Sequence, residues 1–329
     1  MARSIPGPDL SSHPDPAPSY EEAVLTVDAF WDVEEREPLA PEGPSIAMLT
    51  GERTPKAVVL FHGYTTVPRQ FRLIAQGFRD AGCNVWVPRM PFHGLPDRLT
   101  GAPSALTAPM LRDHADRAID VARGLGDSVT VVGLSGGGSL ATWCATARDD
   151  VDETVAISPL MKPLGFPAWA VRLLVSTMPH VPDHYDWWYP KLKQELAGYQ
   201  YPRFSYKGIA AFLQLVYWCE DEARRRPYPV RGRYTLVRND GEDRLDSTFN
   251  ERLVRTLVAP ERLSVYGIEA ADGLKHDIVT PDAFSDNAAS LGVAYEHLSR
   301  ALGIELPDPT RLDEADMEFA AFERTAPLV

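Results

Sequence analysis

The residues best suited to chemistry lie around Ser135, in the stretch Gly133-Leu134-Ser135-Gly136-Gly137. A β-branched run precedes this stretch at residues 129–132, and a small-residue helical pattern follows from Leu140. The pattern predicts a strand, a tight turn and a helix, in which the turn raises the serine hydroxyl above the sheet edge. The positive end of the helix dipole would then point at whatever the serine attacks.

A serine hydroxyl becomes a useful nucleophile only when an imidazole takes its proton and a carboxylate orients that imidazole. The chain supplies these groups in the order Ser135, Asp243 and His276. On a parallel sheet such groups follow the carboxyl ends of successive strands, where they meet at one edge. Asp240 and Asp246 lie in the same loop as Asp243 and remain alternatives for the acid.

Strand and helix patterns alternate along most of the chain, which predicts a mostly parallel, doubly wound α/β sheet covered on both faces. The run at residues 57–61 is continuously apolar, as expected of a strand buried on both faces. Further strands are predicted at residues 84–88, 129–134, 153–157, 234–237 and 263–266, and two opening strands at residues 23–30 and 45–49.

Composition divides the chain into four parts. Residues 1–19 are rich in proline and predict a disordered tail. Residues 20–157 and 228–305 form the predicted α/β core, and residues 158–227, dense in proline and aromatic side chains, form a mainly helical cap. Residues 306–329 make an acidic C-terminal segment.

Five motifs in register carry a family resemblance: residues 62–65 (HGYT), 91–94 (PFHG), 133–137 (GLSGG), 241–245 (GEDRL) and 275–278 (KHDI). Over roughly residues 55–300 the chain resembles the capped carboxylesterases and monoacylglycerol lipases of the α/β-hydrolase superfamily. Their chain order of serine, acid and histidine is the order found here. The resemblance favours Asp243 over the two neighbouring aspartates, and it gives His62 and His93 a structural role beneath the site.

The resemblance also implies that the backbone N–H groups of Tyr64 and Gly136 bind the oxyanion. It implies a serine hydrolase that cleaves carboxylic esters with an apolar acyl or aryl group through an acyl-enzyme, with no metal or organic cofactor. A peptidase, amidase, thioesterase or acyltransferase with the same triad, or a non-catalytic receptor on this fold, are the alternatives. Aromatic residues of the cap region are the expected substrate-binding groups: Trp187, Trp188, Phe212 and Trp218.

Charge and composition limit the partners. The net charge of -13 and the pI near 5.1 disfavour nucleic acid, which needs clustered Lys and Arg, and leave a small-molecule ester as the expected partner. No apolar run reaches the roughly 18 residues of a membrane span, and the first 30 residues do not resemble a signal peptide, so a cytoplasmic protein is expected.

His180 and His184 have a metal-like spacing, but Pro182 between them disfavours the helix such a site needs. The oligomeric state is not indicated.

Overall fold

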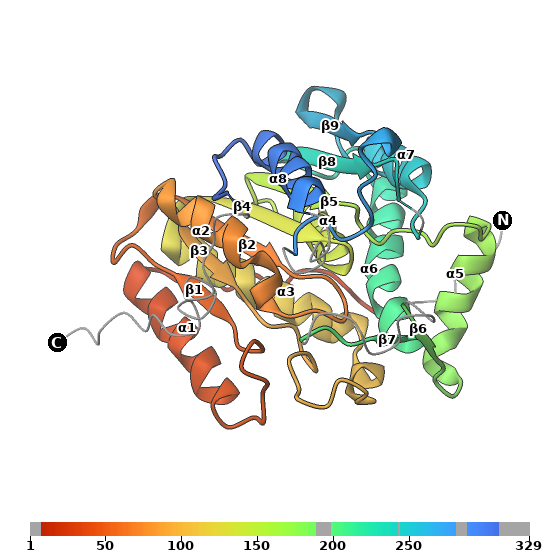
Figure 1. Cartoon of the computed structure of the whole chain (residues 1–329), viewed down its shortest axis with the longest axis horizontal. Coiled ribbons are helices and arrows are strands. Elements are labelled where there is room, and N and C mark those ends of the chain that lie inside the picture. Colours follow the sequence, from red (N-terminus) through yellow and green to blue (C-terminus); the bar gives the residue numbers. More distant parts are fainter. Residues whose placement is uncertain (1–7, 189–198, 243, 281–287, 309–329) are drawn as a thin grey trace.

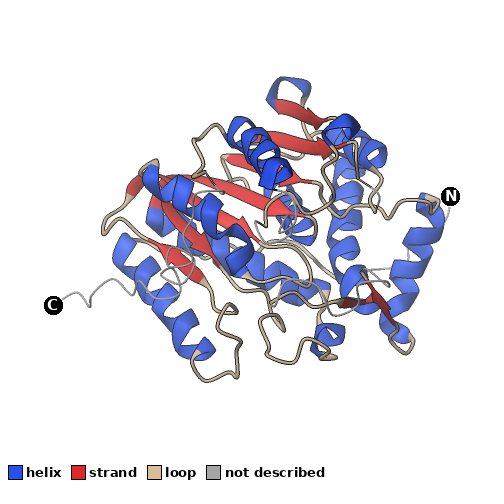
Figure 2. Cartoon of the chain, in the orientation of Figure 1, coloured by secondary structure: helices blue, strands red, loops and turns tan. Residues whose placement is uncertain are grey.

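The computed structural model describes residues 8–188, 199–242, 244–280 and 288–308. Within these ranges the main sheet has seven strands in the order β1-β3-β2-β4-β5-β8-β9 (Figures 1 and 2). Strand β1 pairs antiparallel with β3, and every other pair in this sheet is parallel. The strands are β1 (Ile46–Met48), β2 (Thr54–Phe61), β3 (Asn84–Val87), β4 (Gly126–Leu134), β5 (Glu153–Ile157), β8 (Arg233–Asn239) and β9 (Leu263–Ile268). The predicted mostly parallel, doubly wound sheet is confirmed.

Helices cover both faces of this sheet. They are α1 (Tyr20–Glu34), α2 (Arg72–Asp80), α3 (Ala108–Leu125), α4 (Gly136–Ala147), α5 (Ala168–Thr177), α6 (Tyr206–Arg225), α7 (Ser247–Leu257) and α8 (Ala288–Leu302). Short 3-10 turns occur at η1 (Pro68–Phe71), η2 (Ala102–Ala105), η3 (Met178–His180), η4 (Pro260–Arg262) and η5 (Ala270–Asp272).

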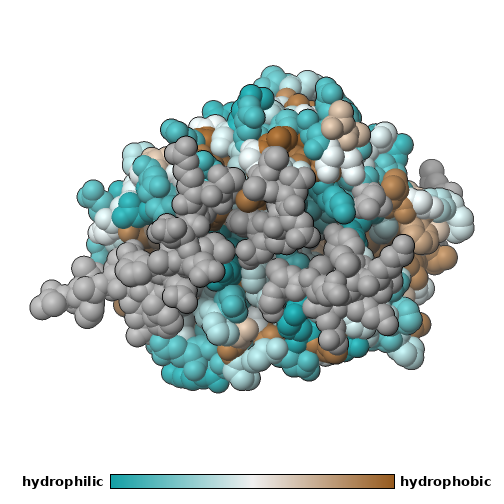
Figure 3. Space-filling model, in the orientation of Figure 1, coloured by the Kyte–Doolittle hydropathy of each residue, from teal (hydrophilic) through white to brown (hydrophobic). Residues whose placement is uncertain are grey.

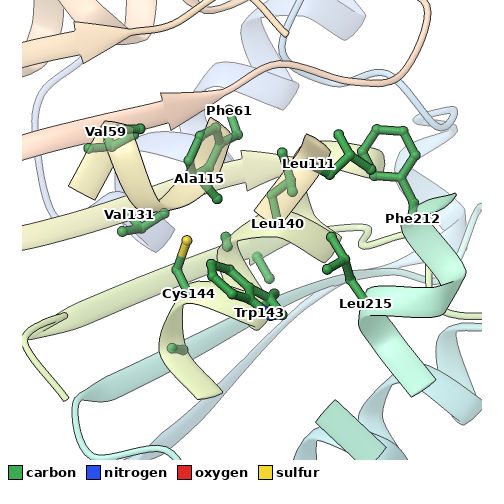
Figure 4. Packing of buried hydrophobic residues seen from close by; sticks show 14 of the residues in the cluster. Val59, Phe61, Leu111, Ala115, Val131, Leu140, Trp143, Cys144, Phe212 and Leu215 are labelled. Carbon is green, nitrogen blue, oxygen red and sulfur yellow. The ribbon is translucent and has the colours of Figure 1, made fainter. Parts of the chain in front are cut away.

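Residues 57–61 of strand β2 show why this run is apolar throughout. The odd-numbered residues Ala57, Val59 and Phe61 pack in one buried cluster with α3, α4 and α6 (Figure 4). Its even-numbered residues Val58 and Leu60 pack in a second cluster with α2 and α8. Because side chains alternate between the two faces of a strand, a strand buried on both sides needs apolar residues at every position.

The N-terminal region differs from its prediction. Residues 23–30, predicted as a strand, belong to helix α1, which begins after the N-cap Ser19. Ala23 and Val27 are both fully buried, four residues apart, and the helix packs on α3. This i, i+4 burial is helical, and tertiary packing of that face decides the structure. The predicted strand at residues 45–49 is confirmed by β1.

Residues 8–19, predicted as part of a disordered tail, instead lie against helices α3 and α4. Leu10 is 2% exposed, and its carbonyl accepts a hydrogen bond from the Trp143 indole at 2.9 Å. The His13 amide donates to the Asp116 carboxylate at 2.8 Å. These partners lie more than 100 residues away in the sequence, so local composition gave no sign of them. Residues 1–7 of the predicted tail lie outside the described residues.

The segment between β5 and β8 contains α5, a small hairpin of β6 (Tyr185–Trp187) and β7 (Arg203–Ser205), and α6. Helix α6 packs on α4 and contributes Phe212 and Leu215 to the main buried cluster (Figure 4). It therefore belongs to the helical layer over the sheet, while α5 lies on its outer side (Figure 1). Apolar side chains are exposed on and just before α5, at the right-hand edge of Figure 3: Leu164, Phe166, Trp169, Leu173 and Leu174.

The three cysteines, Cys83, Cys144 and Cys219, are buried and free. Of the helices that the structure describes, none has the length and apolar character needed to cross a membrane. Of the predicted acidic C-terminal segment, residues 306–308 are described and Leu306 is buried against the second cluster; residues 309–329 lie outside the described residues.

Candidate active site

Ser135 stands in a sharp turn between β4, which ends at Leu134, and α4, which begins at Gly136. Its backbone has φ 55° and ψ -115°, a conformation that a non-glycine residue adopts only at a free-energy cost. The turn also brings two backbones into close contact, since a Cβ on Gly137 would lie 1.9 Å from the Phe61 carbonyl oxygen. The Ser135 amide donates to the Ile157 carbonyl at 3.0 Å and holds the turn on strand β5.

His276 lies in the loop after β9 and η5, and its Nδ1 is hydrogen-bonded to the Glu242 carboxylate. The His276 side chain is 16% exposed and that of Glu242 only 2%. The second Glu242 oxygen accepts the Arg244 amide at 2.7 Å. Burial raises the pKa of Glu242, but the bonds from His276 and from the backbone amides outweigh it and hold that pKa below its usual range. An ionised carboxylate on Nδ1 leaves Nε2 as the basic nitrogen of the imidazole.

The predicted acid, Asp243, lies outside the described residues. Both of its alternatives have other partners: the Asp240 carboxylate binds Arg238 at 2.8 Å, and that of Asp246 binds Lys162 at 2.9 Å and caps helix α7. The sequence pattern did not single out Glu242 as the acid. Glu242 lies in the same five-residue motif as Asp243, and a glutamate carboxyl can orient a catalytic histidine as well as an aspartate carboxyl can.

The two predicted oxyanion residues, Tyr64 and Gly136, lie next to each other. A Cβ placed on Gly136 would lie 3.1 Å from the Tyr64 Cβ, although the residues come from the loops after β2 and β4. Gly136 is the first residue of α4, so its N–H group has no intrahelical acceptor and lies at the positive end of the helix dipole. This edge of the sheet is suited to an anion.

Two buried histidines hold the loop that carries Tyr64. The His62 Nε2 accepts the Met90 amide at 3.1 Å, and the His93 Nε2 accepts the Thr65 amide at 3.2 Å. Burial lowers the pKa of His93 to about 4 and that of His62 well below its usual value. Both rings are therefore neutral near pH 7, as acceptors must be.

A buried glutamine connects this loop to the loop of His276. The Gln70 Oε1 accepts the Gly63 amide at 2.7 Å and the Thr66 hydroxyl at 2.8 Å. Its Nε2 donates to the carboxylate of Asp277 at 3.0 Å, next to His276. Gln70 is 1% exposed, so it acts as an internal brace between the two loops. The sequence pattern did not predict this role for Gln70.

Of the four aromatic residues predicted to bind substrate, the structure places two beside the candidate oxyanion site and one elsewhere. Trp188 donates its indole N–H to the Thr65 hydroxyl at 2.7 Å, and the Phe212 ring lies 3.1 Å from the Cβ position of Gly136. Both therefore lie beside the candidate oxyanion site. Trp187, on β6, is half-buried. Trp218 lies against Trp143 with ring centroids 6.4 Å apart and lines a different cavity.

Within the part of the chain that the structure describes, no group of three His, Cys, Asp or Glu side chains is arranged to hold a metal ion. The Ser135 elbow, the His276–Glu242 pair and the adjacent Tyr64 and Gly136 backbones come from the carboxyl ends of β2, β4, β8 and β9. A serine at a strained turn, an oriented imidazole and nearby backbone N–H groups are the kinds of group that nucleophilic acyl transfer requires.

Solved structures share this architecture. A metagenome-derived lipolytic enzyme superposes with a TM-score of 0.56 at 18% identity, covering 73% of this chain and 94% of its own. A monoglyceride lipase from Saccharomyces cerevisiae gives a TM-score of 0.55 at 13% identity, with 72% and 84% covered. The monoacylglycerol lipase of Paleococcus ferrophilus gives 0.54 at 19% identity, with 71% and 90% covered. At these identities the likeness establishes the fold.

No curated protein matches the chain in a sequence comparison. The family model described as "Alpha/beta hydrolase family" matches residues 58–286, well over half of the sequence. That span includes every element of the site from Tyr64 to His276. The chain belongs to the alpha/beta hydrolase family.

Proposed function

We propose that this protein is a serine hydrolase of carboxylic esters with an apolar acyl or aryl group. Ser135 is the nucleophile, His276 the general base and Glu242 the acid that orients His276. The observation that carries the proposal is the strained Ser135 backbone at the N-terminus of α4, on the sheet edge where His276 is paired with a buried carboxylate.

In the first half-reaction the Ser135 Oγ attacks the ester carbonyl while His276 Nε2 takes the hydroxyl proton. The resulting oxyanion is stabilised by the amides of Tyr64 and Gly136, each contributing on the order of 3 kcal/mol. Collapse of the tetrahedral intermediate breaks the ester C–O bond, and His276 delivers its proton to the leaving alcohol. Water then attacks the acyl-enzyme with His276 as base again, which releases the carboxylic acid and restores Ser135.

The side chains beside the site support an apolar substrate. The centroids of the Phe212 and Tyr64 rings lie 5.4 Å apart, and the Trp188 ring packs at a tilt against Phe204 with centroids 4.2 Å apart. Aromatic walls favour an acyl or aryl group over a charged one. Structural similarity to a lipolytic enzyme and to two monoacylglycerol lipases favours esters over amides or thioesters.

The proposal is tested by labelling the protein with a fluorophosphonate and measuring hydrolysis of p-nitrophenyl esters from acetate to palmitate. We expect stoichiometric labelling of the wild type, and loss of labelling and a fall in kcat on the order of 10⁴- to 10⁶-fold in Ser135→Ala. Ser264→Ala, at an exposed serine on β9, is the matched control and should keep full activity. A folded wild type that neither labels nor turns over any of these esters would overturn the proposal.

A further inference from the structure

A cavity of about 980 Å³ lies between helices α5 and α6. Its walls come from residues 8–11, residues 104–109, the α5–η3 segment and one face of α6. Ser135, Tyr64, Glu242 and His276 are not among its lining residues. Helix α6 separates the two places, because Phe212 faces the Tyr64 ring while Lys207, Ala211 and Trp218 line the cavity. The volume is within the range of small-molecule sites.

The cavity runs lengthwise between two antiparallel helices, which lie side by side in Figure 1. At one end Arg172 of α5 binds Asp221 of α6 at 2.6 Å. Toward the other end η3 contacts α6, and the Asp183 carboxylate accepts the Lys207 backbone amide at 3.0 Å. Residues 207 and 221 are about 21 Å apart along the helix at 1.5 Å per residue. The lining residues on α6 extend over at least this length.

The chemistry of the lining changes along this length. The lining includes apolar side chains from all four segments: Leu10, Leu106, Pro109, Val175, Ala210, Ala211 and Trp218. Among the cations of the lining, Arg172 and Arg225 are paired with carboxylates. Among the described residues no carboxylate oxygen lies within 4 Å of the Lys207 ammonium, and the Asp183 oxygens accept the Ser205 hydroxyl and the Lys207 backbone amide. His180, at the same end, adds an imidazole donor.

We propose that this cavity binds an aliphatic monocarboxylate, a free fatty acid of medium or long chain, as a second site apart from the ester-hydrolysing one. The alkyl chain lies along α6 against Trp218, where it buries apolar surface. The carboxylate lies at the Lys207 end, where a cation without a counter-ion gives a charge-assisted hydrogen bond. Binding at this cavity does not involve Ser135. It can therefore be tested independently of the proposed ester hydrolysis.

Tryptophan fluorescence tests the site directly, with 12-bromododecanoate as a quenching ligand. We expect saturable quenching in the wild type that is largely lost in Trp218→Phe. Binding of the acid should weaken at least about tenfold in Lys207→Gln, whereas 12-bromododecanol should bind both proteins equally, because only the acid uses the charge. Ser176→Phe, which fills the cavity from α5, should abolish saturable quenching, and Thr177→Phe, its neighbour outside the lining, should not.

Three results would overturn the proposal. The first is quenching that does not saturate below the concentration at which the ligand forms micelles. The second is saturable quenching that persists unchanged in Trp218→Phe, which places the ligand elsewhere. The third is equal affinity for the acid in Lys207→Gln and wild type, with both proteins shown to be folded by circular dichroism. This result would mean that the carboxylate does not bind at Lys207.

Discussion

The carboxylate of Glu242 lies where a group must be to fix the tautomer of His276, and it is nearly inaccessible to solvent. Its ionised form is favoured by His276 and by backbone amides against the cost of burial. A neutral amide in its place keeps the shape of the side chain but removes the charge that, in the proposed mechanism, stabilises the imidazolium formed during attack.

The first prediction distinguishes Glu242 from Asp243 as the acid that orients His276. Glu242→Gln should lower kcat/KM for p-nitrophenyl esters on the order of 10³- to 10⁴-fold, and Asp243→Asn should change it by less than about tenfold. Steady-state kinetics on both variants, with folding checked by circular dichroism, makes the comparison. The opposite ranking would assign the acid to Asp243 and contradict the proposed triad.

At the scale of elements, the packing of α6 against the loop after β2 positions Tyr64. The Tyr64 hydroxyl donates to the Ser205 carbonyl at 3.3 Å and accepts the Ser205 amide at 3.2 Å, at the N-cap of α6. Gly208, in the first turn of that helix, leaves the space for the ring, since a Cβ there would lie 2.0 Å from the Tyr64 hydroxyl. The oxyanion loop and α6 are therefore sterically coupled.

The second prediction follows from this contact. Gly208→Ala should lower the free energy of unfolding by about 1–3 kcal/mol through overpacking, and should also lower kcat because Tyr64 must move. Repeating the substitution in a Tyr64→Ala background should remove most of the penalty, which a urea-unfolding double-mutant cycle measures.

Gly292, within α8, is the matched control. A Cβ there meets nothing within 4 Å, so Gly292→Ala should raise the free energy of unfolding by about 0.5–1 kcal/mol through helix propensity alone. An equal effect of the two Gly→Ala substitutions would rule out the coupling between Tyr64 and α6.

At the scale of the whole molecule, three buried histidines make stability depend on pH. Burial lowers the pKa of His114 to about 3 and that of His93 to about 4, and it also lowers that of His62. In the unfolded chain each histidine titrates near pH 6.5. Between about pH 6.5 and 4 the unfolded state therefore binds more protons, and the free energy of unfolding falls as the pH falls.

The third prediction assigns the pH dependence of the free energy of unfolding to these three histidines. Each of the three histidines should contribute up to about 1.4 kcal/mol per pH unit below pH 6.5. Within the described residues the His114 Nε2 has no hydrogen-bond partner, and its ring lies 5.8 Å from that of Phe61. His114→Leu should thus fold at pH 7 and lose roughly a third of the slope. Urea unfolding at pH 7, 6 and 5 measures it, and an unchanged slope would contradict the assignment.

The sequence by itself determined the parts of this protein that depend on neighbouring residues. The apolar run at residues 57–61 predicted a strand with two buried faces, and the GLSGG stretch predicted the strand, turn and helix around Ser135; both are present. Such features are largely local, because side-chain alternation acts between neighbouring residues and a Cβ on Gly133 would lie only 2.1 Å from the carbonyl oxygen of Gly137, four residues on.

Only the tertiary structure decided which distant groups meet. It placed Glu242 on His276, held residues 8–19 on α3 and α4 through Asp116 and Trp143, and made residues 23–30 helical by burying one face of α1 on α3. It also turned Trp218 away from Phe212, into a separate cavity. These outcomes depend on how loops and helices pack over the sheet, and the free energy of that packing comes from partners far away in the chain.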